Sequence, residues 1–131
     1  MILADTSAWV EYLRATGSPV HLHLRRLIAD EDTLATTEVV VMELLAGAST
    51  GDELIRLRRL LGRFELLPVE GLADYEAAAE LYRRCRAGGE TVRKLTDCLI
   101  AAVAVRTGST LLHRDQDFAV IARHAPLQLA E

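Results

Sequence analysis

The chain has 131 residues, of which 50% are hydrophobic and 26% are charged, and its net charge is −4. This composition excludes a disordered chain, and the length suits one domain, so we predict a single domain over residues 1–131. No apolar run reaches the roughly 18 residues of a membrane span, and the two cysteines lack metal-ligand spacing. We therefore expect a cytoplasmic protein with reduced thiols and no membrane contact.

Short apolar strands alternate with helices along the chain. Ser18 and Pro19 are typical of a helix start, whereas Gly47 and Gly108 are typical of helix ends. The predicted elements, in chain order, are a strand at 2–5, helices at 8–15 and 19–29, a strand at 33–36, helices at 38–47 and 52–64, a strand at 65–69, helices at 73–87 and 95–107, a strand at 110–113, a helix at 117–123 and a strand at 127–129. Strands separated by helices predict an α/β fold, a small parallel β-sheet of about five strands covered by helices on both faces.

Three carboxylates stand at places in this pattern where a purely structural role is awkward. Asp5 ends the first strand, although it is also suited to cap the following helix. Glu43 lies in a helix that is apolar around most of its circumference, where an ionised group needs an arginine or a bound cation as its partner. Asp97 opens a buried helix, where Thr96 is available as the cap and the aspartate charge complements the helix dipole.

Two further acids, Asp115 and Asp117, follow the fourth strand. Asp117 is well placed to cap the short helix after it, whereas Asp115 has no such structural role. Asp5 and Asp115 both follow strands, and ligands of open parallel sheets bind beyond the carboxyl ends of the strands. Carboxylates gathered there repel one another, and a hard divalent cation relieves that repulsion. The pattern therefore favours Mg²⁺ or Mn²⁺, and the absence of histidine and cysteine at ligand spacing disfavours zinc.

Basic residues are numerous between residues 51 and 131, although the chain as a whole is acidic. Their usual place is on solvated helix faces. The alternative is a polyanionic ligand, which requires several of them to converge in space. Composition alone does not separate these two interpretations.

Four segments, taken together and in order, resemble the PIN-domain ribonucleases, and specifically the VapC-type toxins of bacterial toxin–antitoxin pairs. The segments are DTSAW at 5–9, VVMELLAG at 40–47, TDCLIAA at 96–102 and HRDQDF at 113–118. The resemblance covers nearly the whole chain and implies a PIN-like fold. It also implies an endoribonuclease that depends on Mg²⁺, or on Mn²⁺ in its place, and cleaves RNA phosphodiesters with a metal-activated water. One departure is Thr96, which stands where the family often has asparagine.

The resemblance also implies roles for particular residues. The family's acidic quartet corresponds to Asp5, Glu43, Asp97 and Asp115. Asp5 and Asp97 would be the principal metal ligands, and the supporting acids would be Glu43, Asp115 and Asp117. A hydroxyl beside the first aspartate, from Thr6 or Ser7, would position an acid or a water. Arg93 and Arg114 are the candidates for binding the substrate.

The expected partners follow from the same resemblance. They are an RNA substrate and a cognate VapB-type antitoxin whose tail occupies the acidic groove. A homodimer is also expected, with Trp9, Tyr12 and the leucines of residues 54–61 supplying apolar surface.

Other functions remain open at this stage. A PIN-like nuclease acting on DNA, a non-toxin RNA-processing nuclease and a catalytically inactive binding module share these features. A phosphoacceptor receiver domain fits less well, because Asp5 stands alone after the first strand and Lys94, the only lysine, lies on the wrong segment.

Overall fold

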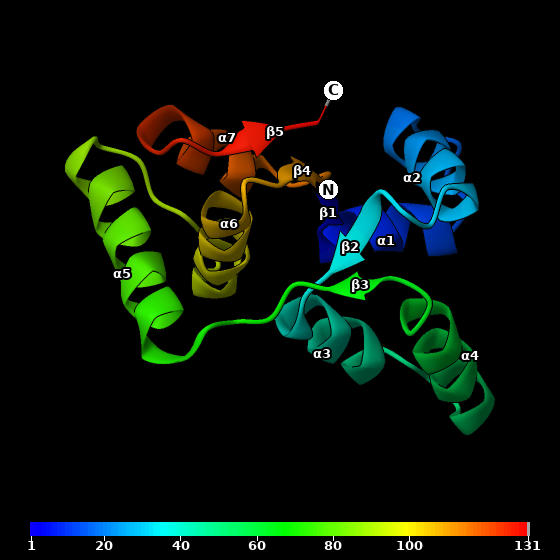
Figure 1. Cartoon of the computed structure of the whole chain (residues 1–131). Coiled ribbons are helices and arrows are strands. Elements are labelled where there is room, and N and C mark those ends of the chain that lie inside the picture. Colours follow the sequence, from blue (N-terminus) through cyan, green and yellow to red (C-terminus); the bar gives the residue numbers. More distant parts are fainter. Residues whose placement is uncertain (131) are drawn as a thin grey trace.

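A computed structural model of the chain describes residues 1–130, which form five strands and seven helices (Figure 1). The strands are β1 (Ile2–Ala4), β2 (Leu34–Thr36), β3 (Glu65–Leu66), β4 (Thr110–Leu112) and β5 (Gln128–Leu129). The helices are α1 (Thr6–Leu13), α2 (Pro19–Ala29), α3 (Glu38–Ala46), α4 (Gly51–Leu61), α5 (Gly71–Ala87), α6 (Leu95–Thr107) and α7 (Gln116–His124). The predicted α/β class and the order of strands and helices are confirmed.

The five strands form one parallel sheet in the order β3-β2-β1-β4-β5. The first strand is central, with Ile2 opposite Leu34 of β2 on one side and opposite Thr110 of β4 on the other. From β1 the chain builds the sheet outward to β3, then crosses over to add β4 and β5 on the opposite side. The sheet therefore reverses its order between β1 and β4, and ligands of such sheets bind at the carboxyl ends of these two strands.

Several predicted boundaries were wrong, and three of the differences have a local cause. Helix α1 begins at Thr6 rather than at residue 8, because the Asp5 side chain accepts a hydrogen bond from the backbone N–H of Ser7 and caps the helix. Strand β3 ends at Leu66, since Pro68 has no N–H with which to continue the ladder. Helix α5 begins at Gly71, where Asp74 accepts from the backbone N–H of Glu70.

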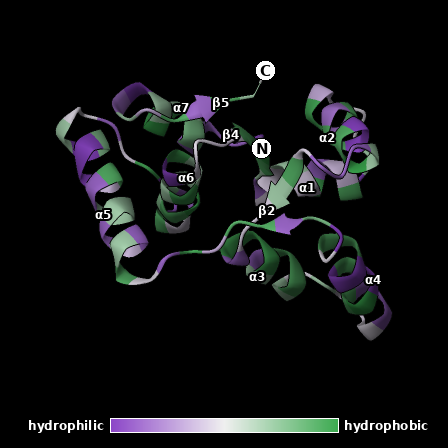
Figure 2. Ribbon diagram, viewed as in Figure 1, coloured by the Kyte–Doolittle hydropathy of each residue, from purple (hydrophilic) through white to green (hydrophobic). Residues whose placement is uncertain are grey.

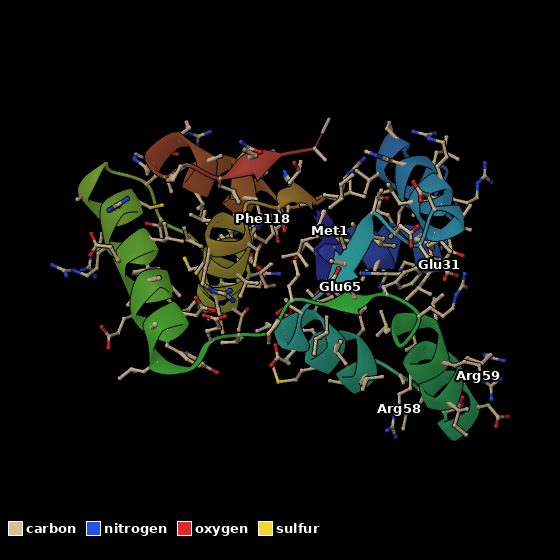
Figure 3. All side chains as sticks on the ribbon, viewed as in Figure 1. Met1, Glu31, Arg58, Arg59, Glu65 and Phe118 are labelled. Atoms are coloured by element: carbon tan, nitrogen blue, oxygen red, sulfur yellow. The ribbon has the colours of Figure 1, made fainter. Side chains whose placement is uncertain are left out.

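Helix α6 is the centre of the hydrophobic core. Its residues from Asp97 to Ala104 are all buried, and it packs most extensively against α5 on its outer side (Figure 1). Figure 2 shows α3 mostly green, whereas α5 carries purple residues, as expected for a helix with one face in water. Phe118 of α7, labelled in Figure 3, is fully buried and completes the core on the β4 side.

Helices α5 and α6 are also joined by a partly buried ion pair. Arg106, near the end of α6, donates to the carboxylate of Asp74 at 2.9–3.2 Å. This contact lowers the pKa of Asp74, although burial acts in the opposite direction. Within residues 1–130, no helix is long and apolar enough to cross a membrane.

Truncation of the core side chain of Ile100 tests this packing. Ile100 is fully buried, so Ile100→Ala should lower the free energy of unfolding by about 2–5 kcal/mol. Urea unfolding followed by the fluorescence of Trp9, the only tryptophan, measures the change. The matched control is Leu72→Ala, at a residue that is 71% exposed, which should change the free energy by less than about 1 kcal/mol. Equal losses in the two variants would contradict the assigned core.

Candidate metal centre

The candidate centre lies at the carboxyl ends of the neighbouring strands β1 and β4. Asp5 follows β1, and its backbone N–H donates to the carbonyl of Leu112 at the end of β4. Asp115 comes three residues after that strand, and Asp97 enters from the first turn of α6. Asp97, Asp115 and Asp117 form an acidic cluster. Each of the three carboxylates places an oxygen within 4.8 Å of the other two.

Asp5 is buried, and its two carboxylate oxygens have different surroundings. Oδ2 accepts hydrogen bonds from the backbone N–H of Ser7 at 2.9 Å and from the Ser7 hydroxyl at 2.6 Å. Oδ1 is buried and has no hydrogen-bond partner among the described residues. Burial raises the pKa of Asp5, and the charge of Glu43 adds to the rise, while the bonds from Ser7 oppose it. Asp5 is thus a helix cap and still has one unpartnered oxygen.

Glu43 joins the site through a hydroxyl. The Thr6 hydroxyl donates to Glu43 Oε1 at 2.7 Å, which links the beginning of α1 to the middle of α3. The expected alternative, an ion pair between Glu43 and an arginine, is not found among residues 1–130. Helix α3 is also less enclosed than its sequence suggested, because neighbouring Met42 is 58% exposed.

The pKa of Asp97 is strongly raised. Burial, a hydrogen bond with Asp117 and the charge of Asp5 together raise it to about 8, although the charge of Lys94 opposes the rise. Its Oδ2 atom is buried without a hydrogen-bond partner in the described part of the chain, and its nearest cation is Lys94 Nζ at 3.9 Å. The expected cap, Thr96, is not at the helix start, because α6 begins at Leu95 and Lys94 stands at the cap position.

The roles expected for Asp115 and Asp117 as helix caps are reversed. Asp115 Oδ1 accepts from the backbone N–H of Asp117 at 2.9 Å, so Asp115 caps α7 and does have a structural role. The buried Asp117 instead accepts the backbone N–H groups of Arg93 and Lys94, each at 3.1 Å. The loop before α6 therefore supplies donors for Asp117, which sequence reasoning could not foresee because 24 residues separate Arg93 from Asp117.

The side chains of the same loop supply positive charge to the site. Arg93 Nη2 donates to Asp115 Oδ1 at 2.7 Å, and Lys94 Nζ lies 3.3 Å from Asp115 Oδ2. Burial opposes a rise in the pKa of Lys94, but the charges of Asp97, Asp115 and Asp5 raise it nevertheless. Lys94 was assigned no role from the sequence, although its place three residues before Asp97 was a usable signal.

The remaining candidates lie around this centre. Ser7 bridges two segments, since its hydroxyl binds Asp5 and accepts the backbone N–H of Arg114 at 2.8 Å. The exposed side chain of Arg114 lies 3.9 Å from Glu11. The ring of His113 packs against Phe118 with 5.3 Å between ring centroids, and burial lowers the pKa of this histidine.

These side chains fit a hard divalent cation. Two buried carboxylate oxygens, Asp5 Oδ1 and Asp97 Oδ2, lack donors, and ionised carboxylates without donors are costly to bury. Oxygen ligands are those that Mg²⁺ and Mn²⁺ prefer. Lys94 and Arg93 contact these carboxylates and partly balance their charge.

Comparison with known proteins agrees with this geometry. The PIN domain family matches residues 2–124. The chain belongs to the PIN-domain family. It is 50% identical over 131 residues to ribonuclease VapC11 of Mycobacterium tuberculosis, covering 99% of this chain and 98% of that protein. The recognised resemblance to VapC-type ribonucleases is confirmed, and with it the expectation of an endoribonuclease.

Solved structures support the fold. A toxin–antitoxin complex from Klebsiella pneumoniae matches with a TM-score of 0.69 and 22% identity, covering 91% of each chain. VapC20 of Mycobacterium tuberculosis, titled a sarcin–ricin loop cleaving toxin, matches with a TM-score of 0.68 and 23% identity, covering 98% of this chain and 99% of that one. At these identities the likeness bears on the fold, and the roles of individual acids stay predictions.

The raised pKa of Asp97 predicts that Asp97→Asn increases thermal stability at high pH. The folded state holds the proton of Asp97 more tightly than the unfolded state, so stability falls as pH rises from about 4 to about 8. Asparagine does not ionise, so in EDTA at pH 8 the variant should melt higher than the wild type, by roughly 3–5 °C for each kcal/mol regained. The difference should vanish near pH 4.

Thermal melting with added Mn²⁺ completes this test. Mn²⁺ should stabilise the wild type by mass action and Asp97→Asn much less. The exposed control Asp32→Asn should behave like the wild type in both buffers. A wild-type melting temperature that Mn²⁺ leaves unchanged would contradict the site.

Proposed function

We propose that this protein is the ribonuclease toxin of a toxin–antitoxin pair and that it hydrolyses RNA phosphodiesters at the acidic cluster with a divalent cation, Mg²⁺ or Mn²⁺. The observation that carries the proposal is the pair of unpartnered, buried carboxylate oxygens on Asp5 and Asp97, at the point where the sheet reverses its order. When bound, the cation lowers the pKa of a water molecule and offsets charge on the phosphodiester.

The chain's own residues hold the acids in place. Ser7 fixes the orientation of Asp5 through two hydrogen bonds, and Thr6 fixes Glu43 through one. Asp5 and Asp97 would bind the cation directly, while Glu43 and Asp115 would complete the site through water. The side chain of Asp117 is occupied by the N–H groups of Arg93 and Lys94, so we assign it to positioning that loop.

The basic side chains next to the acids are suited to bind a substrate phosphate. Arg93 is 67% exposed at its side chain although it contacts Asp115 and Asp117, so its outer surface faces solvent. We propose RNA as the substrate because the VapC relatives are named ribonucleases. A DNA substrate remains the second candidate, since phosphate contacts alone do not distinguish the two.

A VapB-type antitoxin is the proposed inhibitor, and a cation on its tail would occupy the acidic cluster. Support comes from the similar toxin–antitoxin complex of Klebsiella pneumoniae and from the guanidinium of Arg93, which already binds Asp115. We also propose that the protein acts in the cytoplasm, a location that suits the free, buried thiols of Cys85 and Cys98.

A homodimer is also proposed, but not on the surface first expected. Trp9 is fully buried, where it packs against Tyr12 and Phe64, so Trp9 is not available to a second copy. Exposed Tyr75 and Leu95 instead line an apolar hollow between α5 and α6. The part of that face around Tyr75, about two helical turns before Arg83 on α5, is the better candidate for contact between two copies.

Removal of one metal-binding carboxylate tests the activity. Asp97→Asn should keep its circular dichroism spectrum but cleave RNA at least ~100-fold more slowly, because the cation loses a ligand. The wild type should stop cleaving in excess EDTA and recover with Mg²⁺ or Mn²⁺. Gel analysis of labelled total RNA measures both effects, and single-stranded DNA is assayed in parallel as the alternative substrate.

The matched control for this experiment is Asp32→Asn, which removes a carboxylate from an exposed turn and should cleave at the wild-type rate. Fragment ends should be linear phosphates. Products ending in a 2′,3′-cyclic phosphate, or full cleavage in EDTA, would refute hydrolysis by a cation-activated water. Cleavage of DNA in preference to RNA would favour the second candidate.

A further inference from the structure

One face of α5 carries a tyrosine and two arginines beside the acidic cluster. Arg86 follows Arg83 by three residues and Tyr82 by four, so its side chain neighbours both of theirs on the helix surface. They line a hollow of about 440 Å³ whose other wall comes from the loop before α6, with Val92 and Arg93. The hollow therefore lies between α5 and that loop.

Arg93 connects this hollow to the candidate metal centre. The same side chain lines the hollow and donates to Asp115 at 2.7 Å and to Asp117 at 3.3 Å. A linear ligand at the acidic cluster that passes over Arg93 enters the hollow directly. Two sites joined by one side chain suit a polymer better than two separate small molecules.

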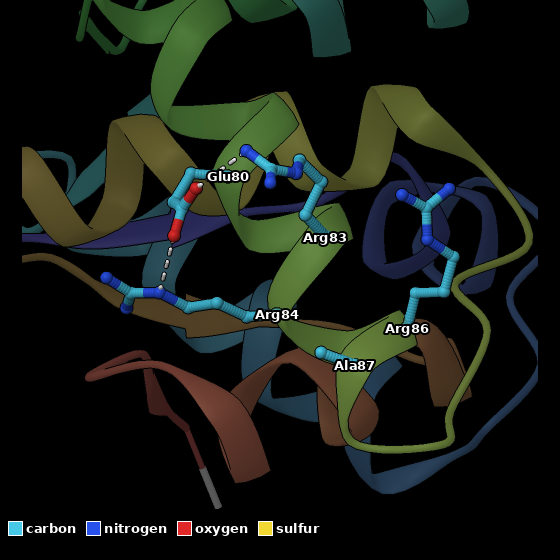
Figure 4. A pocket seen from close by; sticks show the side chains of 5 residues that line it. All are labelled: Glu80, Arg83, Arg84, Arg86 and Ala87. Atoms are coloured by element: carbon cyan, nitrogen blue, oxygen red, sulfur yellow. Dashed lines mark hydrogen bonds and ion pairs between the residues drawn. The ribbon is translucent and has the colours of Figure 1, made fainter.

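The arginines of the hollow retain uncompensated positive charge. Among residues 1–130, no carboxylate lies within 4.0 Å of the Arg86 guanidinium. Arg83 reaches only Glu80, at 3.7 Å, and Glu80 also binds Arg84 at 3.2 Å. Figure 4 draws a neighbouring pocket on the same helix, in which Arg83 and Arg84 both reach Glu80 while Arg86 extends apart from them. A pair of exposed guanidinium groups on one side is an attractive site for phosphate.

The walls of the hollow also offer flat surfaces. The Arg86 guanidinium lies over the ring of Tyr82, 5.7 Å from its centroid, and Tyr82 is half-buried. Nucleobases splayed out of single-stranded RNA stack on aromatic rings and on guanidinium planes. The apolar side chain of Val92 beside them is buried, so this wall of the hollow is shielded from water.

We infer that the hollow between α5 and the loop before α6 binds one nucleotide of the RNA strand next to the cleaved phosphodiester, with Arg83 and Arg86 on its phosphate and Tyr82 with Arg86 against its base. This inference rests on the proposed function and extends it from the reacting phosphate to a second subsite. Arg93 then acts at the junction, between the acids and the strand.

The test measures RNA binding apart from cleavage. In an Asp97→Asn background, a fluorescein-labelled pool of random 20-nucleotide single-stranded RNAs is titrated with the full chain at several NaCl concentrations, with fluorescence anisotropy as the readout. The double variant Arg83→Gln/Arg86→Gln should bind roughly 10-fold more weakly. The slope of log affinity against log salt should fall by about 0.7, the value for one phosphate of a single strand.

Two matched controls separate this site from general electrostatics. Arg58→Gln/Arg59→Gln removes the same charge from α4, at the far end of the molecule from α5 (Figure 3), and should leave affinity and slope nearly unchanged. Tyr82→Phe should retain RNA affinity, whereas Tyr82→Leu should lose several-fold of it with no change in salt slope. Circular dichroism confirms that each variant is folded.

Other outcomes would overturn the inference. Equal losses of RNA affinity in the α5 and α4 double variants would reject the subsite. The proposed function would still stand if the wild type cleaves RNA. Weakened binding of a co-expressed antitoxin with unchanged RNA affinity would show that the hollow serves a protein partner instead. A wild-type chain that neither binds nor cleaves RNA with Mn²⁺ would reject the proposed function and this inference together.

Discussion

The buried carboxylates of Asp5 and Asp97 each keep one oxygen without a hydrogen-bond donor, in a protein whose fold brings them to the same edge of the sheet. Such groups destabilise a folded chain unless a proton or a cation compensates them. The pKa of Asp97, raised to about 8 by burial, shows how strongly the fold opposes its charge. Binding a cation at such a site should therefore stabilise the folded chain strongly, because the cation compensates the buried ionised carboxylates.

The loop before α6 meets this requirement with its own cations. Asp117 holds the loop by accepting two of its backbone N–H groups. The loop in turn places the side chains of Arg93 and Lys94 against the acids. The loop therefore shapes two neighbouring sites, since Arg93 also lines the basic hollow against α5. An acidic centre and a basic hollow are compatible in one small protein because Arg93, which contacts both, separates them.

The sequence predicted the order of strands and helices well, because alternation of apolar strands with helices is a local pattern. It also predicted that Asp5 and Asp115 lie at one edge of the sheet, since both follow strands whose ends a parallel sheet brings together. It failed where partners are distant: the exchange of capping roles between Asp115 and Asp117 depends on a loop 24 residues away. The burial of Trp9 likewise depends on Phe64, far along the chain, so its apolar side chain was mistaken for free surface.

The central claim is that Asp5 and Asp97 share a bound divalent cation, and crystals of the wild-type chain grown with Mn²⁺ test it most directly. An anomalous difference map should show a manganese peak about 2.1 Å from Asp97 Oδ2, with Asp5 Oδ1 in its coordination sphere directly or through one water. Lys94 Nζ should then have moved away from the acids. Full occupancy of manganese elsewhere on the chain, with both oxygens still unpartnered, would contradict the account.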